Sequence, residues 1–199
     1  TLLLAAKIDA LSNQINPHFL FNTLASISSL IRTQPDTARM LIIKLSGLLR
    51  RLMRSSDHFV TLREELESVD EYLDIEVVRF GPQLKVIKRI SPDTLDVMVP
   101  SMILQPLVEN SIKHGIGARA GVGRIAIIVS RTASQLVIEI HDDGRGIGSG
   151  IVREGVGLAN CRSRLQMLYG VDRCSLEIAN RDGGGAAVRM AVPFEAARV

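Results

Sequence analysis

The spacing of apolar residues changes near Gly81-Pro82, and this change limits the fold more than any other feature of the sequence. Before it, apolar side chains recur every three or four residues, which is the spacing of one face of an α-helix. After it, they come in short β-type runs separated by turns, with two helical runs among them. The sequence therefore predicts a helical part followed by an α+β part.

Two helices are predicted before residue 57. Their apolar stripes are Leu4, Ile8, Leu11, Ile15, Leu20, Leu24, Ile27 and Ile31 in the first, and Leu41, Leu45, Leu48 and Leu52 in the second. Pro35 is predicted to end the first helix and Asp36 to cap the second, so that the pair forms a helical hairpin. Because one hairpin buries little apolar area alone, we expect two copies to pair as a four-helix bundle in a homodimer.

A third helix is predicted over Leu62–Phe80, where a Gly-Pro pair stops it. Its acidic residues are predicted to face water: Glu64, Glu65, Glu67, Asp70 and Glu71. The chain is thereby divided into three parts. These are a dimerisation hairpin over 1–57, a connecting helix over 58–82 and an α+β domain over 83–199.

Five β-type runs and two helical runs are predicted beyond residue 83. The β-type runs are Leu84–Ile90, Arg124–Arg131, Gln135–His141, Ser175–Asn180 and Ala187–Val192, and the helical runs are Ser101–His114 and Leu158–Leu168. The strands mostly come at hairpin-length separations, whereas the helices come in separate blocks. That pattern is typical of a two-layer α/β sandwich, in which helices cover one face of a mixed, mostly antiparallel sheet.

The composition excludes several classes of protein. Apolar residues make up 46% and charged residues 23% of the chain, which is typical of a folded protein and not of a disordered one. The net charge of +3 is too small to argue for nucleic acid, so no nucleic acid partner is predicted. Cys161 and Cys174 form no zinc or disulfide pattern, which favours a reducing cytoplasm. No apolar run approaches the ~18 residues of a membrane span.

One helical face carries Asn110, Lys113 and His114 at positions i, i+3 and i+4. An amide oxygen suits a hydrated Mg²⁺, which takes oxygen ligands and often shares them with phosphates. A lysine offers those phosphates a point charge. The alternative is a solvated polar face that lies beside a hydrophobic core face.

A second motif follows an alternating strand and reads Asp142-Asp143-Gly144-Arg145-Gly146-Ile147. A carboxylate at the end of a strand can accept a hydrogen bond from an exocyclic amine such as adenine N6. The glycines after it let the backbone lie close against a flat ring. The alternative is an ordinary Asp-Gly turn.

A third motif, Gly155-Val156-Gly157-Leu158, opens a helical run. Glycines at a helix N-terminus expose free N–H groups to phosphate. Residues 148–154 before it are small and polar, which suits a mobile lid over a nucleotide. A single Gly-x-Gly is weak evidence when it stands alone.

In this order, the three motifs resemble the ATP-binding domain shared by histidine kinases, DNA gyrase, Hsp90 and MutL, which is known as the GHKL type. The resemblance covers roughly residues 84–199. It implies that the domain binds ATP and Mg²⁺, and that Asn110 holds the metal. The other implied nucleotide-binding residues are Lys113, His114, Asp142, Gly144, Gly146, Ile147, Gly155, Val156, Gly157 and Leu158.

A string around position 18 resembles the phosphoacceptor motif of the LytS-type sensor histidine kinases, and it reads Asn16-Pro17-His18-Phe19-Leu20-Phe21-Asn22. The resemblance implies that His18 accepts the γ-phosphoryl group of ATP and passes it to a response regulator. Histidine side chains are competent nucleophiles because much of the imidazole is unprotonated at pH 7. The family also implies a membrane or sensory segment upstream, so the chain is expected to be the cytoplasmic domain of a plasma-membrane sensor.

The motif departs from most other histidine kinases at one position. Phe19 stands where those kinases have an acidic residue that helps to take the proton of the phosphoacceptor. Since no acid near His18 in sequence can serve as the base, either Gln14 or Asn22 is expected to orient the ring, or an acid of the ATP-binding domain reaches it, for which Glu109 is the candidate base. Asn22 could also position water. The missing acid also leaves open a non-catalytic module that only binds nucleotide.

A second comparison concerns ATP hydrolysis. Enzymes of the gyrase, Hsp90 and MutL branch have a glutamate one helical turn before the magnesium asparagine, and it activates water. Pro106 stands at that position, four residues before Asn110, and it cannot act as a base. A GHKL-type ATP hydrolase is therefore the less favoured alternative.

Overall fold

Two compact units make up the part of the chain that the computed structural model describes, which is residues 17–54, 58–113, 122–147 and 155–194. The first unit contains the N-terminal helices and Asp70–Arg79, while the second contains Phe59–Val69 and the residues from Phe80 onward. One helix, α4 (Leu62–Phe80), contributes to both units. Within these described ranges, no helix is both long enough and apolar enough to cross a membrane.

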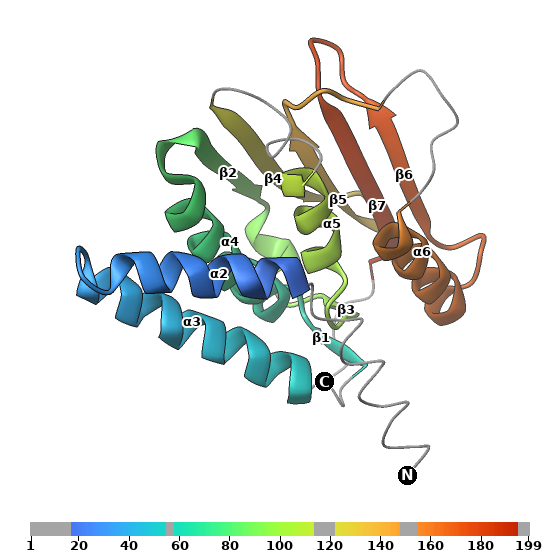
Figure 1. The fold of residues 1–199 in the computed structure, drawn as a ribbon. Helices are drawn as coiled ribbons and strands as arrows, with labels where there is room; N and C mark the ends of the chain where they lie inside the picture. Colours follow the sequence, from blue (N-terminus) through green and yellow to red (C-terminus); the bar gives the residue numbers. More distant parts are fainter. Residues whose placement is uncertain (1–16, 55–57, 114–121, 148–154, 195–199) are drawn as a thin grey trace. The chain divides into compact units, whose positions relative to one another are not determined.

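The first unit is built on a helical hairpin of α2 (Pro17–Leu30) and α3 (Pro35–Arg54) (Figure 1). A 2.7 Å hydrogen bond from the Gln34 N–H to Leu30 O closes the turn between them. We predicted that Pro35 ends the first helix, and this is wrong. Pro35 is the first residue of α3, where its missing N–H costs no helical hydrogen bond.

The predicted leucine stripe of α3 is buried. Leu41, Leu45 and Leu48 are at most 6% exposed, and Ala38 extends the stripe by one turn toward the N-terminus. The side chain of Leu52 lies outside the described residues. The helical spacing of these residues therefore places one face of α3 in the core, as predicted.

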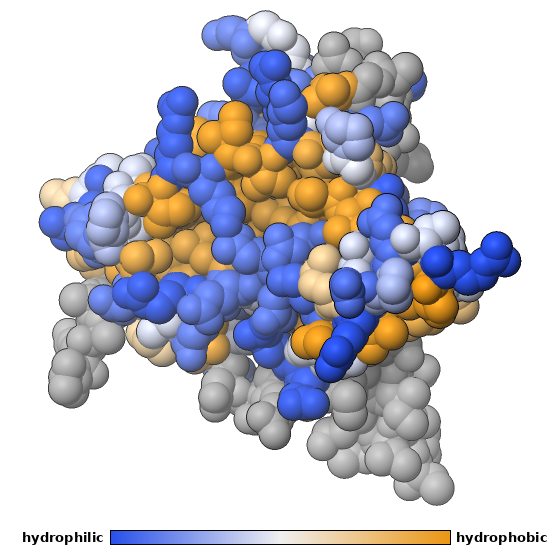
Figure 2. Space-filling view, turned by 90° about the vertical axis from the view of Figure 1, so that its left-hand side faces the viewer, coloured by the Kyte–Doolittle hydropathy of each residue, from blue (hydrophilic) through white to orange (hydrophobic). Residues whose placement is uncertain are grey.

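The face that α2 turns to the core agrees only in part with the stripe that we predict. Ile27 of that stripe is buried, as are Phe19 and Thr23, whereas Leu24 and Ile31 are 48% and 57% exposed. The Phe19 and Tyr72 rings pack with their centroids 4.9 Å apart, and the Thr23 hydroxyl can be buried because it donates to Phe19 O at 2.8 Å. Leu24 and Ile31 are thus among the apolar side chains that reach the surface. Figure 2 shows apolar residues beside charged ones on one face of the molecule.

The second unit is a two-layer α/β sandwich (Figure 1). In chain order its further elements are β1 (Phe59–Thr61), the 3₁₀ turn η1 (Gly81–Gln83), β2 (Leu84–Ile90), the 3₁₀ turn η2 (Pro92–Thr94), β3 (Met98–Pro100), α5 (Leu104–Ser111), β4 (Gly123–Arg131), β5 (Gln135–Asp142), α6 (Val156–Tyr169), β6 (Ser175–Asn180) and β7 (Ala186–Pro193). The short strands β1 and β3 pair with each other. The other described strands form one sheet in the order β2-β4-β5-β7-β6, in which β2 and β4 are parallel and the remaining pairs are antiparallel. The predicted mixed, mostly antiparallel sheet is confirmed.

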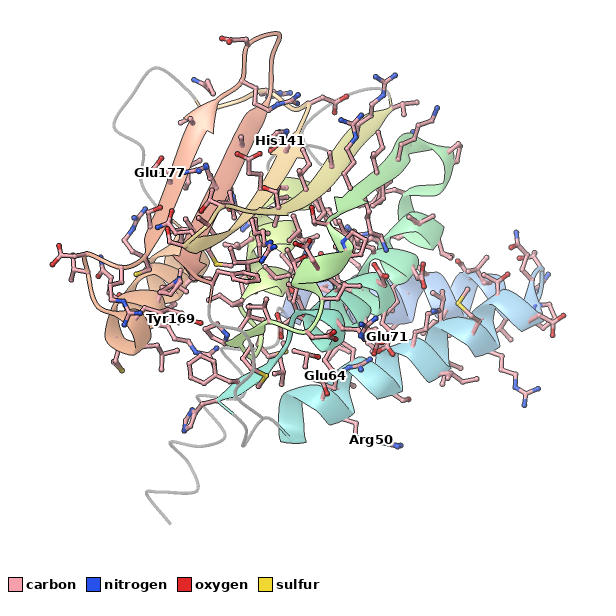
Figure 3. The ribbon with its side chains drawn as sticks, turned by 180° about the vertical axis from the view of Figure 1, so that it is seen from behind. Arg50, Glu64, Glu71, His141, Tyr169 and Glu177 are labelled. Carbon is pink, nitrogen blue, oxygen red and sulfur yellow. The ribbon has the colours of Figure 1, made fainter. Side chains whose placement is uncertain are left out.

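Helices α5 and α6 cover one face of this sheet (Figure 1). The large side chains of β4 and β5 that are fully buried form the core, and they are Ile125, Ile127, Leu136, Ile138 and Ile140. The opposite face carries polar residues such as His141 on β5 and Glu177 on β6 (Figure 3). On that face Arg189 Nε lies 3.4 Å from Glu139 Oε1.

The connecting helix α4 begins with a capping box. Glu64 Oε2 accepts hydrogen bonds from the backbone N–H and the hydroxyl of Thr61, both at 2.8 Å, and the Glu64 N–H donates to Thr61 Oγ1 at 3.3 Å. The backbone bond, followed by the hydroxyl bond, holds the pKa of the Glu64 carboxyl below its ordinary value of 4.5. The start of α4 is thus fixed by its own sequence.

We expect Glu64→Ala to lower the free energy of unfolding at pH 7 by about 1 kcal/mol or less, because the carboxylate is largely exposed. Since the pKa of Glu64 is lower in the folded state, its stabilisation is fully present above pH 4.5 and is lost as the pH falls through the folded-state pKa. Urea unfolding at neutral pH and at about pH 3 measures this difference. Glu67→Ala, at an exposed position of the same helix, is the control, and an equal effect of Glu64→Ala at both pH values would contradict the prediction.

Glu65 is buried, which contradicts our prediction that it faces water. The side chain is 3% exposed, and its carboxylate accepts hydrogen bonds from the backbone N–H groups that precede and open α5. Burial raises the pKa of Glu65 above 4.5, while these backbone bonds lower it by a smaller amount. The first N–H groups of a helix need acceptors from outside the helix, and here a carboxylate from α4 supplies them.

Candidate functional site

Asp142 ends β5, and the residue is only 5% exposed. Its Oδ1 accepts hydrogen bonds from the N–H groups of Gly144, at 3.0 Å, and Ala186, at 3.3 Å. The other oxygen, Oδ2, accepts no hydrogen bond from the described residues. The carboxylate is therefore held by one oxygen and offers the second as an acceptor, which is what recognition of an exocyclic amine requires.

Close backbone packing fixes the loop after Asp142 on the β6–β7 hairpin. A Cβ on Gly185, where φ is +83°, would lie 2.0 Å from Asp142 O. A Cβ on Gly146, where φ is +72°, would lie 2.7 Å from Asn180 Oδ1. Only glycine fits at these two positions. Gly146, which we singled out as a nucleotide-binding residue, thus also allows the loop to pack on the hairpin.

Asn180 and Arg181 hold the same loop with side-chain hydrogen bonds. Asn180 Oδ1 accepts from the Ile147 N–H at 2.6 Å, and Asn180 Nδ2 donates to Ile147 O at 3.1 Å. Arg181 Nη1 donates to Asp142 O at 3.0 Å. Neither residue is predicted from the sequence as part of the site, because both lie at the end of a β-type run, where the sequence indicates only a turn before Gly183–Gly185.

We expect Asn180→Ala to weaken nucleotide binding by about fivefold to thirtyfold, because each of the two lost hydrogen bonds contributes about 1 kcal/mol to holding the loop. Isothermal titration with ADP measures the dissociation constant. Glu177→Ala, at an exposed position of the same strand, should leave that constant unchanged. Equal affinities for wild type and Asn180→Ala would show that the two hydrogen bonds between Asn180 and Ile147 do not contribute to binding.

The helix α5 and the residues after it carry the next group of predicted site residues. Asn110 is half-buried and its amide makes no hydrogen bond with the described residues, while Lys113 is exposed. Glu109 Oε1 accepts a hydrogen bond from Gln105 Nε2 at 2.9 Å. His114 lies outside the described residues, so its predicted role stays a prediction.

The N-terminus of α6 is open. Gly155 is its cap residue, and no side chain caps the first turn among the described residues. The first backbone bond of the helix runs from the Ala159 N–H to Gly155 O at 3.1 Å, so the N–H groups of residues 156–158 have no helical acceptor. A Cβ on Gly155 or Gly157 would meet nothing within 4 Å. Backbone N–H groups without a helical acceptor at the start of a helix suit an anion such as phosphate. Residues 148–154, the predicted lid, lie outside the described residues.

The elements that carry these groups adjoin one another within the second unit. The helix α5 packs against both α6 and β5. The described residues hold no cluster of three or more His, Cys, Asp or Glu side chains that could bind a metal by themselves. The free amide of Asn110 beside the exposed ammonium of Lys113 fits Mg²⁺ that is shared with phosphate oxygens, since Mg²⁺ is often held by one or two protein groups and substrate.

His18 lies in the first turn of α2 with its side chain exposed, next to the buried Phe19. The amide nitrogen of Asn22, one turn later, lies 3.2 Å from each ring nitrogen of His18. Asn22 can therefore donate to an unprotonated ring nitrogen and restrict the orientation of the imidazole. The proposed base, Glu109, belongs to the other unit, so its role toward His18 remains a prediction.

Two protein families match the chain in succession. The histidine kinase family matches residues 6–84, and the histidine kinase-, DNA gyrase B-, and HSP90-like ATPase family matches residues 96–196. The second match covers half of the chain and includes α5, β5 and the N-terminus of α6. The first match includes His18 and Asn22.

Curated relatives match nearly the whole chain. The sensor histidine kinase YpdA of Escherichia coli is 39% identical over 175 residues, which cover 83% of this chain and 31% of that protein. The sensor protein LytS of Oceanobacillus iheyensis is 35% identical over 208 residues, which cover 97% of this chain and 35% of that protein. The chain thus spans about a third of the length of these relatives.

Solved structures of low sequence identity share the fold. The histidine kinase domain of the blue-light activated histidine kinase EL346 from Erythrobacter litoralis has a TM-score of 0.54 at 19% identity, with 95% of this chain and 91% of that chain covered. The catalytic domain of the histidine kinase ThkA has a TM-score of 0.54 at 15% identity, over 69% and 99% of the two chains. ThkA in complex with the response regulator protein TrrA also matches, with a TM-score of 0.54 at 15% identity over 92% and 61%. With its two family matches and its LytS relatives, the chain belongs to the histidine kinase family of the LytS sensor type, and its C-terminal half is a histidine kinase-, DNA gyrase B-, and HSP90-like ATPase domain.

Proposed function

We propose that the chain is the catalytic core of a two-component sensor kinase that binds Mg-ATP and transfers the γ-phosphoryl group to His18. The observation that carries the proposal is the exposed imidazole of His18, which Asn22 orients on α2 while Phe19 anchors the helix. The γ-phosphorus of ATP can approach a nucleophile only if the side chain is exposed. A nucleophile that is already held in position lowers the barrier to in-line attack.

The second unit is proposed to supply the nucleotide. Oδ2 of Asp142 accepts a hydrogen bond from the exocyclic amine of adenine, and the free N–H groups at the start of α6 donate to the phosphates. Asn110 and Lys113 face the polyphosphate, where bound Mg²⁺ neutralises charge. The Asp142 carboxylate would thereby hold the base, the α6 backbone amides and the Lys113 ammonium would hold the phosphates, and the Asn110 side chain would hold the metal.

In the proposed reaction an unprotonated ring nitrogen of His18 forms a bond to the γ-phosphorus. The bond from that phosphorus to the bridging oxygen breaks, and ADP leaves with the electron pair. The ring proton must pass to a base, for which Glu109 is our candidate. Catalysis of this kind depends mainly on positioning and charge neutralisation, because the protein forms few covalent bonds of its own.

We also infer the partners from the same family. A response regulator receives the phosphoryl group, an inference that the complex of ThkA with TrrA supports. A homodimer would cover the exposed apolar residues of the first unit, among them Phe21, Leu24 and Ile43. The names of its relatives describe them as sensors, and the chain would then be the cytoplasmic part of a membrane sensor.

The purified chain incubated with Mg²⁺ and γ-labelled ATP tests the proposal. Acid-labile, base-stable label on the protein is expected, and Asn110→Ala should prevent its appearance. Free phosphate without label on the protein would favour the ATP hydrolase, which Pro106 disfavours. Nucleotide binding with neither label nor free phosphate would favour the non-catalytic module.

A further inference from the structure

One short loop, residues 101–104, is held by a carboxylate from outside its own helix. Glu65 Oε1 accepts from the Met102 N–H at 2.5 Å, and Glu65 Oε2 accepts from the Ile103 and Leu104 N–H groups, both at 3.1 Å. The helix α5 has no side-chain cap of its own, since its cap residue is Ile103. The N–H groups of the two residues before α5 and of its first residue therefore depend on a side chain of α4.

The loop also stores backbone strain. Met102 has a φ of 58°, and it is the one non-glycine residue with a positive φ among the described residues. Such a conformation is unfavourable for a residue with a Cβ, and it persists only where surrounding contacts enforce it. The bonds to Glu65 at Met102 and the two following residues are contacts of that kind.

The helix α6 holds the same loop from another side. Arg164 Nη1 donates to Ser101 O at 2.5 Å, and the buried Cys161 Sγ lies 3.9 Å from Ile103 O. The guanidinium of Arg164 also acts electrostatically on Glu65. Three helices, α4, α5 and α6, thus meet at residues 101–104.

Two of these helices carry the proposed nucleotide site. Asn110 lies toward the end of α5, six residues after the last N–H that Glu65 binds, and the free N–H groups at 156–158 open α6. The third helix, α4, continues through Val69 into residues that belong to the first unit. At 101–104 the connecting helix therefore binds the start of α5 through Glu65, and α6 binds the same loop through Arg164.

We propose that Glu65 is a positioning residue of the nucleotide site, which links the N-terminal half of α4 to α5 and α6 so that nucleotide binding and the order of α4 depend on each other. The proposal rests on the proposed function, since it names a regulatory contact of the same site. Coupling of this kind is reciprocal. If Glu65 of α4 stabilises the site that binds nucleotide, then bound nucleotide stabilises α4 by the same free energy.

Glu65→Gln is the informative variant because it keeps the shape of the side chain. Its amide NH₂ must replace one of two oxygens that both accept from N–H groups, so at least one donor loses its acceptor. Glu67→Gln makes the same change at an exposed position of the same helix and serves as the control. Both variants are compared with the wild-type chain.

Two measurements with ADP test the proposal. Titration calorimetry should show about tenfold weaker ADP binding for Glu65→Gln, within the usual range of coupling between sites, and no change for Glu67→Gln. Hydrogen exchange should show that ADP slows exchange of the amides at 66–69 in the wild type, and that Glu65→Gln abolishes this slowing. A purely structural role would lower stability and raise exchange equally with and without ADP.

The outcomes separate this inference from the proposed function. Two results would overturn the inference and leave nucleotide binding intact. In one, the wild type binds ADP but the amides at 66–69 are not protected from exchange. In the other, Glu65→Gln binds ADP as tightly as the wild type does. If Glu65→Gln fails to fold, the exchange experiment on the wild type still decides. A wild-type chain that binds no ADP overturns the proposed function itself.

Discussion

Transfer of phosphoryl groups from ATP to the chain is expected to fall on the order of a thousandfold, to background, when His18 is replaced by glutamine. An amide nitrogen has no lone pair available for attack, whereas the imidazole of His18 does. Because the side chain is exposed, the substitution should change the free energy of unfolding by no more than about 0.5 kcal/mol. Acid-labile label from γ-labelled ATP measures the effect.

The chain offers a matched control for this substitution. His58 is also exposed, and it lies outside the proposed phosphoacceptor helix. We expect His58→Gln to incorporate label at the wild-type rate, and His18→Gln to bind ADP with wild-type affinity, because His18 belongs to the first unit and the nucleotide residues to the second. Label that persists in His18→Gln would place the phosphoacceptor elsewhere.

The second large effect is expected at Asp142, where Asp142→Asn should weaken ATP and ADP binding by about 10- to 100-fold. A hydrogen bond to a charged acceptor contributes about 1.5–3 kcal/mol. The asparagine is expected to place its oxygen where Oδ1 was, because that position accepts hydrogen bonds from the Gly144 and Ala186 N–H groups. The NH₂ group of the asparagine then takes the place of Oδ2. An exocyclic amine of the base would then face a donor instead of an acceptor.

Asp143 provides the comparison for this prediction. Its Oδ1 accepts a hydrogen bond from the Arg124 N–H at 2.7 Å, so that it helps to fix the start of β4. Asp143→Asn keeps an oxygen for that bond, and we expect ADP affinity within about threefold of wild type. GTP, which has a carbonyl at the corresponding ring position, should bind Asp142→Asn no worse than it binds wild type. Equal ADP affinity for Asp142→Asn and wild type would remove Asp142 from the site.

Much of the second unit could be predicted from the sequence because its strands obey one simple rule. Buried and open positions alternate along β4, with Ile125, Ile127 and Val129 inside, and the five predicted β-type runs agree with β2, β4, β5, β6 and β7 to within one residue at each end. The strands β1 and β3 were missed because three residues are too few to show a period. The predicted helix 101–114 proved shorter, since α5 begins only at Leu104.

The errors in the candidate site share a physical cause, which is that a polar side chain can be buried once it finds partners from distant segments. Glu65 looked like one of several solvated acids, but backbone N–H groups 37 to 39 residues away hold it inside. Asn180 looked like a turn residue, but its amide binds Ile147 on another loop. Such pairings depend on tertiary structure, and nothing in the local pattern around either residue indicates them.

The strand order has a consequence for how copies of the chain can associate. The edge strand β2 exposes Lys85 and Arg89, and a second β2 laid along it would bring these cations together. Pairing of two molecules through their β2 strands is therefore opposed by charge repulsion. Self-association should then use surfaces other than the β2 edge, such as the exposed apolar side chains Phe21, Leu24 and Ile43 of α2 and α3.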